Sequence, residues 1–453
     1  MQGVQTIGNA TLIAYDDAPI LSTDPWMGGD HFAYFGSWHL PYEIPSNIRE
    51  DIIKSKYIWF SHGHPDHINP DSLNLFKKNQ ILVSEHFGSR IYNDLKEENF
   101  NISILKDREW TNLSKNISVM SISTKTQDSI LLVRCNNDIF INLNDAGIYS
   151  SKFIKKTISK FKRKFMLSIS SFEADMLNFF DQDNNFITPA IANKFSAGEY
   201  LSMLANVLGA NYIIPFSTFH EYQRDDSIWV NKYIYPIEKV DEGINKKHTY
   251  IKPFSFINSA KDDDISTLNI KKKKLEIKSS SLFGDNWKDE LNISDKKIIE
   301  DYFNKFLSFK EKIGFISFVV GGKELNLKFN GPKNKGISFE VPRNSLITAC
   351  KYKIFDDLLI GNFMKTKLYQ LNSLYDSSAD FTHEICKFGD NGQAYTEEEL
   401  KKYKNYYAKK MGKEYFLDLF STASKDHFKY FFKNYQSSKY YDKLKKVYYY
   451  LLK

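Results

Sequence analysis

The segment Tyr57-Ile-Trp-Phe-Ser-His62-Gly-His64-Pro-Asp66-His67 places an apolar run directly before a polar loop. The run predicts a buried strand, and the loop holds three histidines and one aspartate. His62 and His64 are two residues apart, so an extended backbone directs both rings to one side, whereas the turn at the proline brings Asp66 and His67 in from another direction. Imidazole and carboxylate are ligands for zinc, iron and manganese. The loop is therefore predicted to bind one or two divalent metal ions.

Similar short, strand-like runs alternate with helical patterns from residue 1 to about residue 245. This alternation is typical of an α/β layered domain. In such domains, functional side chains gather just past the carboxyl ends of strands, which is where the polar residues of interest stand here. The other predicted strands are Ala10–Tyr15, Gln80–Ser84, Ile130–Cys135, Ile139–Leu143 and Tyr212–Phe216.

The chain has 453 residues, which is too long for one ordinary compact core. A polar, charge-mixed stretch over residues 246–290 is expected to be a linker or exposed loop. Residues 1–245 then form the catalytic domain, and residues 291–453 form a second region that is α+β and mostly helical. In this second region we expect a helix over Ile298–Phe309, a hairpin of Phe315–Val320 with Leu325–Phe329, and an amphipathic packing helix over Tyr430–Lys453.

The net charge of +7 does not indicate a nucleic-acid partner, because the lysines are scattered among acidic residues along most of the chain. The N-terminus lacks a signal-like apolar run, and no stretch reaches about 18 uninterrupted apolar residues. We therefore expect a cytoplasmic protein without a membrane partner. The three cysteines are far apart and form no CxxC pair, which argues against a disulfide framework or a thiolate zinc site.

An HxHxDH motif directly after an apolar strand resembles the metallo-β-lactamase superfamily. The resemblance implies an αββα sandwich with a metal centre built on His62, His64, Asp66 and His67. It also implies roles for three distant residues. Asp24 corresponds to an aspartate that orients ligand histidines without binding the metal, Asp145 to a bridging carboxylate, and His220 to a late histidine that completes the second metal site.

The superfamily pattern is incomplete in one place. A further histidine is expected between the HxHxDH loop and Asp145, yet the corresponding stretch around residues 123–132 contains none. Gln127 or Asp128 can replace it as a ligand. Otherwise the first metal site is one imidazole short.

The second metal site keeps two histidines and one carboxylate, namely Asp66, His67 and His220. This set is the facial triad of oxygen-activating non-haem iron. A two-zinc hydrolase needs both sites filled, with a bridging hydroxide as the nucleophile. The pattern therefore favours iron, with zinc or manganese as alternatives.

Within the superfamily, the sequence resembles most the group of CMP-N-acetylneuraminate hydroxylase and UDP-N-acetylmuramic acid hydroxylase. This resemblance implies hydroxylation of a nucleotide-linked acidic sugar, with electrons supplied by an attached Rieske iron–sulfur domain. The chain has no paired cysteine and histidine ligands for such a cluster, so either a separate protein donates electrons or the chemistry has changed. The segments that carry the resemblance are Asp24–Gly28, Gly36–Pro41, Asn142–Asp145, Pro215–Trp229 and Phe355–Met364.

Four residues flank the proposed ligands in sequence and are candidates to line a substrate cleft, with ordinary packing as the alternative. They are Trp38, His39, Tyr222 and Arg224. Arg224 can pair with a phosphate or carboxylate of the substrate, or form a surface salt bridge. Asp356 and Asp357 can form a paired-carboxylate site, but a position at a helix N-terminus explains them more simply.

Three functions are consistent with these residues. The first is an iron-dependent oxygenase acting on a sugar or nucleotide sugar, with Asp66 and Asp145 as the catalytic carboxylates. The second is a metallo-hydrolase of phosphodiesters, lactones or amides, in which a ligand-loop aspartate accepts a proton. The third is a non-catalytic, metal-stabilised binding protein. The sequence does not indicate the oligomeric state.

Overall fold

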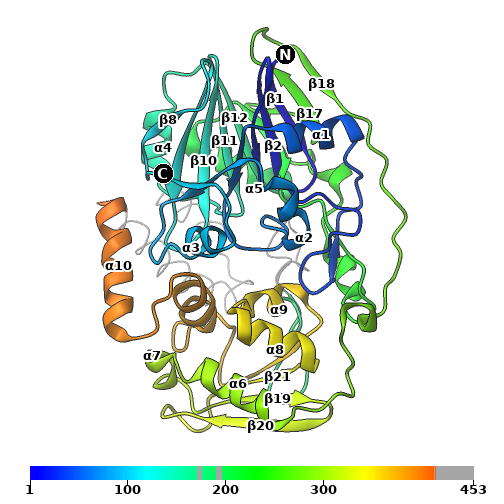
Figure 1. Cartoon of the computed structure of the whole chain (residues 1–453), viewed down its shortest axis with the longest axis vertical. Coiled ribbons are helices and arrows are strands. Elements are labelled where there is room, and N and C mark those ends of the chain that lie inside the picture. The colour runs from blue at the N-terminus through cyan, green and yellow to red at the C-terminus, as the bar shows by residue number, and fades with distance from the viewer. Residues whose placement is uncertain (171–175, 190–195, 413, 415–453) are drawn as a thin grey trace, which may run out of the picture.

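Two facing β-sheets form the body of the N-terminal part of the chain (Figure 1). The computed structural model describes residues 1–170, 176–189, 196–412 and 414. The first sheet has the order β18 (Ile265–Thr267), β17 (Ser255–Asn258), β1 (Gln2–Ile7), β2 (Thr11–Asp16), β3 (Ala18–Thr23), β5 (Tyr57–Phe60), β6 (Gln80–Ser84) and β7 (Ile102–Leu105). The second has the order β16 (Thr249–Tyr250), β14 (Tyr212–Phe216), β12 (Arg163–Ile169), β11 (Asp138–Asn144), β10 (Ser129–Cys135), β9 (Ile117–Ser123) and β8 (Trp110–Asn112).

Apolar side chains join these sheets into four layers. Residues of both sheets, among them Trp59 and Phe140, form a core between them. The outer face of the first sheet packs against α1 around Ile58, and the outer face of the second packs against α5 around Ile141. The order helix, sheet, sheet, helix confirms the predicted αββα sandwich. The helices of this part are α1 (Ser46–Lys54), α2 (Pro70–Leu73), α3 (Arg90–Glu97), α4 (Ser151–Thr157) and α5 (Ala197–Leu208).

The apolar run before the HxHxDH loop is β5, buried on both faces. Trp59 points into the core between the sheets, while Ile58 and Phe60 point to the outer layer. A strand buried on both sides needs a continuous apolar sequence, which explains why the run was recognisable. All six predicted strands are confirmed to within one residue at each end.

Parallel pairing determines where the ligand loops meet. In the first sheet β5 runs parallel to β3, and in the second sheet β11 and β14 both run parallel to β12. Parallel neighbours share the edge at which their carboxyl ends lie, so the loops that follow β3 and β5 emerge together, as do those that follow β11 and β14. These four loops supply the predicted ligands.

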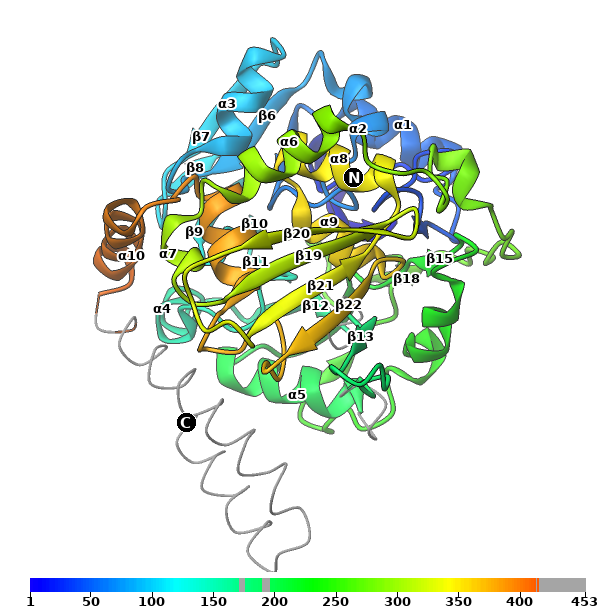
Figure 2. The same cartoon turned by 90° about the horizontal axis from the view of Figure 1, so that it is seen from below.

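The second region lies against the sandwich and has its own sheet, which Figure 2 shows from below. Its strands have the order β13 (Phe179–Phe180), β22 (Lys365–Tyr369), β21 (Gly336–Glu340), β19 (Phe315–Val320) and β20 (Lys323–Lys328). The predicted hairpin is confirmed as β19 and β20, whereas the single helix predicted over Ile298–Phe309 is two helices, α6 (Ile293–Phe303) and α7 (Leu307–Lys310). The other helices are α8 (Arg343–Tyr352), α9 (Phe355–Gly361), a π-helix (Thr382–Asn391) and α10 (Glu397–Met411).

The expected division into domains needs two corrections. Residues 246–290 are not only a linker, because β16, β17 and β18 extend both sheets of the sandwich. These strands are short and half-polar, so their composition resembles that of a loop. In addition, β13 lies before the expected boundary but pairs with β22 of the second region. The helix predicted over Tyr430–Lys453 lies outside the described residues.

Along the described ranges, no helix combines the length and the apolar character that a membrane span requires.

Replacing Trp59 with alanine tests the core that positions the ligand loop. The indole is fully buried between the sheets, so its removal should lower the free energy of unfolding by about 3–5 kcal/mol. Urea denaturation followed by far-UV circular dichroism measures this. Trp110→Ala in β8 is the matched control, because Trp110 is 38% exposed and its loss should change stability by no more than about 0.5 kcal/mol. Equal losses in the two variants would contradict this core.

Candidate metal centre

The predicted ligands converge at one edge of the sandwich. The first sheet contributes Asp24 after β3 and the HxHxDH loop after β5, and the second sheet contributes Asp145 after β11 and His220 after β14. Two sets of side chains, each with its possible ligand atoms within 4.8 Å of one another, share Asp145. We call His62, His64 and Asp145 the first group, and Asp66, His67 and Asp145 the second group.

In the first group, two imidazoles point at a common position. Nε2 of His62 lies 2.9 Å from Nδ1 of His64 and 3.8 Å from Oδ2 of Asp145. The other nitrogen of His62, Nδ1, lies 2.9 Å from the hydroxyl of Ser61. The HxH spacing thus brings both rings to one side, as the sequence predicts.

In the second group, Nε2 of His67 lies between two carboxylates. It is 3.4 Å from Oδ2 of Asp66 and 3.3 Å from Oδ2 of Asp145. The same Oδ2 atom of Asp145 therefore faces an imidazole nitrogen of both groups. This is the geometry expected of a bridging carboxylate.

Further buried residues hold these ligands in place. Asp24 accepts a hydrogen bond from the backbone N–H of Ser61 and lies 3.2 Å from Nδ1 of His67, behind the ring. Asn9 and Tyr34 donate hydrogen bonds to the two carboxylate oxygens of Asp66, at 2.9 and 2.6 Å.

The bridging carboxylate is fixed in the same way, because the hydroxyl of Ser217 donates to Oδ1 of Asp145 at 2.5 Å. Sequence reasoning anticipated the position of Asp24 from the family resemblance but missed Asn9, Tyr34 and Ser217, since a lone hydroxyl or amide carries no motif.

His220 is buried and has no hydrogen-bond partner on either ring nitrogen. Its ring stacks on Trp38 at a centroid distance of 3.4 Å. Burial lowers the pKa of His220 to about 4, while the nearby charges of Asp66 and Asp145 act in the opposite direction. Neither the first group nor the second group, each defined by ligand atoms within 4.8 Å of one another, includes His220. A buried imidazole without a partner is costly, and a metal ion beside Asp66 would satisfy it.

Buried charges set the electrostatics of the centre. Burial and the neighbouring imidazoles lower the pKa of His62 well below its ordinary value. Burial alone would also lower the pKa of His67, but the carboxylates of Asp66, Asp145 and Asp24 raise it well above the ordinary value. His67 therefore sits in a strongly negative environment, which favours a cation.

Neither Gln127 nor Asp128, the two residues that could replace the missing histidine, is placed as a ligand of the first group. Oδ1 of Asp128 lies 4.0 Å from Nδ1 of His62, the ring nitrogen that faces away from the common position. Gln127 donates to the hydroxyls of Tyr403 and Tyr407 in α10.

His86 is also used elsewhere. Its two ring nitrogens lie 2.9 Å from the hydroxyl of Tyr407 and 2.8 Å from that of Ser129.

Two carboxylates of the second region reach the centre. Asp356 and Asp357 stand in the first turn of α9, as the simpler interpretation of their sequence expects. They are nevertheless buried beside His64, and Nε2 of His64 lies 3.0 Å from Oδ2 of Asp356. The ammonium group of Lys387, from the π-helix, lies 3.4 Å from the same oxygen. His64, Asp356 and Asp357 form a third set of possible ligands within 4.8 Å of one another.

Two of the four candidate substrate residues are packed away from any cleft. Tyr222 is fully buried, and its hydroxyl donates to the backbone carbonyl of Ile360 at 3.2 Å. Arg224 is also fully buried and forms ion pairs with Asp226 and Asp285, each at 2.8 Å. The sequence left two roles open for Arg224, a substrate contact or a surface salt bridge. Arg224 forms a salt bridge, but inside the protein rather than at the surface. It is not placed to bind a substrate.

The other two candidates lie next to His220. Trp38 and His39 form β4 (Trp38–His39), which pairs with β15 (Glu221–Tyr222). Nε2 of His39 lies 3.6 Å from the carboxylate of Glu221. Trp38 therefore supports the proposed ligand His220 by stacking, which is closer to ordinary packing than to substrate contact.

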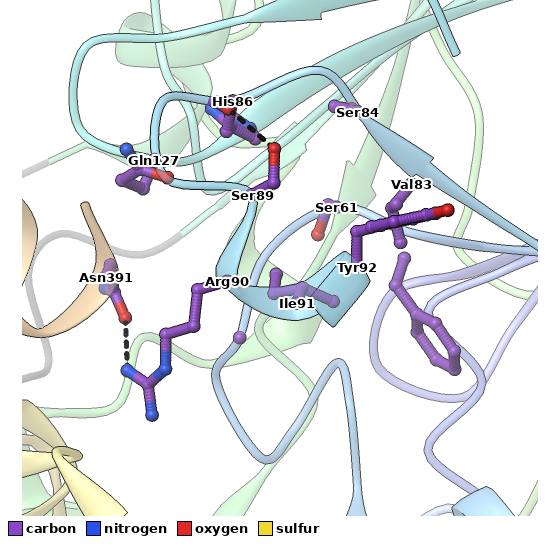
Figure 3. Close-up of a pocket in the computed structure, with 12 residues that line it drawn as sticks. Ser61, Val83, Ser84, His86, Ser89, Arg90, Ile91, Tyr92, Gln127 and Asn391 are labelled. Atoms are coloured by element: carbon purple, nitrogen blue, oxygen red, sulfur yellow. Dashed lines mark hydrogen bonds between the residues drawn. The ribbon is translucent and has the colours of Figure 1, made fainter. Parts of the chain in front are cut away.

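A cavity lies on the other side of the ligand loop, beside Ser61 and Gly63 (Figure 3). Its polar wall includes Ser89, Gln127 and Asn391, and Figure 3 shows the Arg90 side chain reaching Asn391. No residue of the first or second group lines this cavity, and neither does His220.

The residues present fit a metal ion. Metal–nitrogen and metal–oxygen bonds of about 2.0–2.2 Å place two ligands of one ion no more than about 4.4 Å apart. Four of the separations within these groups are 2.9, 3.3, 3.4 and 3.8 Å, and all four meet this condition. The αββα sandwich and the HxHxDH loop at its edge define a protein of the metallo-β-lactamase fold.

Comparisons with known proteins give one curated relative and several solved structures. Over 107 residues the chain is 29% identical to a cytidine monophosphate-N-acetylneuraminic acid hydroxylase from Asterias rubens, a match that covers 22% of this chain and 16% of that protein's length. The isothiocyanate hydrolase from Delia radicum gut bacteria has a TM-score of 0.38 and 14% identity, covering 58% of this chain and 98% of its own. CmlA, a diiron β-hydroxylase from Streptomyces venezuelae, has a TM-score of 0.37 and 10% identity, covering 56% and 52%. No family model matches the chain.

The buried His86 gives a prediction for the pH dependence of stability. Burial lowers its pKa from 6.5 in the unfolded chain to about 3. As the pH falls from about 6.5 towards 4, the unfolded chain therefore binds a proton that the folded chain does not, and the free energy of unfolding decreases. His86→Gln should reduce this slope by at most about 1.4 kcal/mol per pH unit, measured by urea denaturation of metal-free protein at several pH values. An unchanged slope would contradict a neutral, buried His86.

Proposed function

We propose that this protein is a metal-dependent oxygenase whose iron is held by Asp66, His67 and His220. His220 carries the proposal, because both its ring nitrogens are buried without hydrogen-bond partners and the carboxylates of Asp66 and Asp145 act on its pKa. Two imidazoles and one carboxylate form the facial triad that leaves positions open on non-haem iron. The partial likeness to a hydroxylase also supports oxygen chemistry.

The chain's own residues prepare this site for an ion. Asn9 and Tyr34 fix both oxygens of Asp66, and the contact with His67 keeps the pKa of Asp66 below its ordinary value despite burial. Ser217 occupies Oδ1 of Asp145 and leaves Oδ2 facing both groups. A bound divalent ion would supply Lewis acidity towards water or, as iron, redox chemistry with dioxygen.

The family resemblance suggests a substrate of the nucleotide-linked acidic sugar class. The 453 residues of the chain contain no paired cysteine and histidine ligands for an iron–sulfur cluster, so we propose that a separate protein donates the electrons; the alternative is that the chemistry has changed. All three of its cysteines are buried and free, and they lie apart along the chain. We propose a cytoplasmic location, because free cysteines without disulfides fit a reducing compartment.

A hydrolase is the second candidate, and one observation favours it. Oδ2 of Asp145 faces both the first and the second group, which is the arrangement that places two ions side by side. Such a pair suits hydrolysis of phosphodiesters, lactones or amides. In this case the ligand-loop carboxylate of Asp66, beside Nε2 of His67, would accept the proton from water.

Metal analysis of protein purified without added metal distinguishes the candidates. Iron together with substrate-dependent oxygen consumption supports the oxygenase, and zinc together with phosphodiester or lactone turnover supports the hydrolase. Retained metal with neither activity indicates a metal-stabilised binding protein. Absence of bound metal, even after iron or zinc is supplied, would refute a metal centre.

His220→Ala tests the ligand assignment. The variant should lose the ion of the second group, so that its metal content falls by about one equivalent relative to the parent protein. His39→Ala is the matched control, because His39 is a neighbouring imidazole that faces Glu221 and belongs to neither group. Unchanged metal content in His220→Ala would show that His220 is not a ligand.

A further inference from the structure

The two ring nitrogens of His64 have different neighbours. Nδ1 lies 2.9 Å from Nε2 of His62, at the common position of the first group. Nε2 lies 3.0 Å from Oδ2 of Asp356, which belongs to α9 and stands 292 residues further along the chain. The side chain of Asp356 is only 4% exposed. The sandwich and the second region therefore meet at this imidazole.

A carboxylate on one nitrogen determines what the other nitrogen can do. When Nε2–H of His64 donates to Asp356, the lone pair is left on Nδ1, which points at the common position of the first group. The carboxylate also fixes the ring orientation and makes the imidazole a stronger ligand.

His67 is arranged in the same way, with the roles of its two ring nitrogens exchanged. Asp24 lies behind its Nδ1, and Nε2 is left facing Asp66 and Asp145. Each group thus has one imidazole supported by one buried carboxylate. The sandwich supplies this carboxylate for the second group, and the second region supplies it for the first.

We propose that Asp356 is a positioning residue of the metal centre, and that the first group is complete only when α9 is docked on the sandwich. This inference rests on the metal centre of the proposed function and goes beyond its iron site of Asp66, His67 and His220, because it requires that the first group bind an ion as well. It assigns to the second region a direct part in metal binding, beyond covering the edge of the sandwich.

The contacts around α9 show how this docking is held. The hydroxyl of Tyr222, in the sandwich, donates to the carbonyl of Ile360 at the end of α9 and accepts from Asn362 at 2.9 Å. Arg90 donates to the backbone carbonyl of Lys353, just before α9, and to that of Asp390 in the π-helix. Hydrogen bonds from two separate parts of the sandwich therefore fix the position of Asp356.

A direct role for Asp356 and Asp357 as ligands of a separate ion is less consistent with the geometry. Such an ion would have to bind Nε2 of His64, while the ion of the first group binds Nδ1 of the same ring. An imidazole that binds two ions must lose both its protons. A positioning carboxylate requires no such change.

Titration of the full-length, metal-free chain with Co²⁺ tests the proposal. The parent protein should bind two ions, and Asp356→Asn should weaken one of them by about 10- to 100-fold and alter the visible absorption of that ion alone. Asp24→Asn should weaken the other ion instead. In a His62→Ala background, where the first group is already broken, Asp356→Asn should have little further effect.

Asp285→Asn is the matched control for a loss of stability that does not involve the metal centre. Asp285 is as buried as Asp356 and binds Arg224 and Ser345, away from His64. Its loss should lower the melting temperature while leaving both Co²⁺ affinities within about twofold of the parent. Asp356→Glu, which keeps a carboxylate, serves if Asp356→Asn does not fold, and should retain more affinity than Asp356→Ala.

Unchanged affinities and spectra in Asp356→Asn would overturn the positioning role while leaving the metal centre intact. Loss of a third equivalent of Co²⁺ would overturn it in favour of a separate site. A parent protein that binds no Co²⁺ would instead refute the proposed function itself.

Discussion

The structure depends on burying several carboxylates together at one edge of the sandwich. Asp24, Asp66 and Asp145 lie within 3.5 Å of the His67 ring nitrogens, and Asp356 and Asp357 lie beside His64. Like charges in a buried space repel one another and lose their hydration, so they need cations or protons. Asp357 is an example of this repulsion, because burial and the charge of Asp356 both raise its pKa well above the ordinary value. Divalent ions would relieve it most directly.

The features that the sequence predicts well are those set by neighbouring residues. The strand before the loop is buried on both faces and therefore reads as an apolar run, and the HxH spacing fixes the direction of His62 and His64 through backbone geometry alone. Asp24 and Asp145 follow strands that are themselves recognisable. Parallel pairing accounts for the carboxyl ends that meet within each sheet, and the packing of the two sheets face to face brings Asp145 to the loop.

What the sequence does not predict depends on contacts between distant segments. A charge in a sequence does not name its partner, so Arg224 could be assigned to a substrate although Asp226 and Asp285 bind it inside the protein. Residues 246–290 resemble a linker in composition because two of their three strands, β16 and β18, lie at sheet edges, where few apolar residues are needed. The place of Asp356 beside His64 depends on the docking of two regions, and no local pattern encodes that docking.

The contribution of Asp356 also limits what the fold alone can say about chemistry. Sandwiches of one fold carry many reactions, and the choice among them lies in the residues around the ions. Here one of those residues comes from outside the sandwich, and Lys387 beside it adds a positive charge that a sandwich alone would lack. The first group therefore has properties set by the second region. Because the second group is supported by Asp24 from within the sandwich, the two groups can differ in affinity and in preferred metal even though they share Asp145.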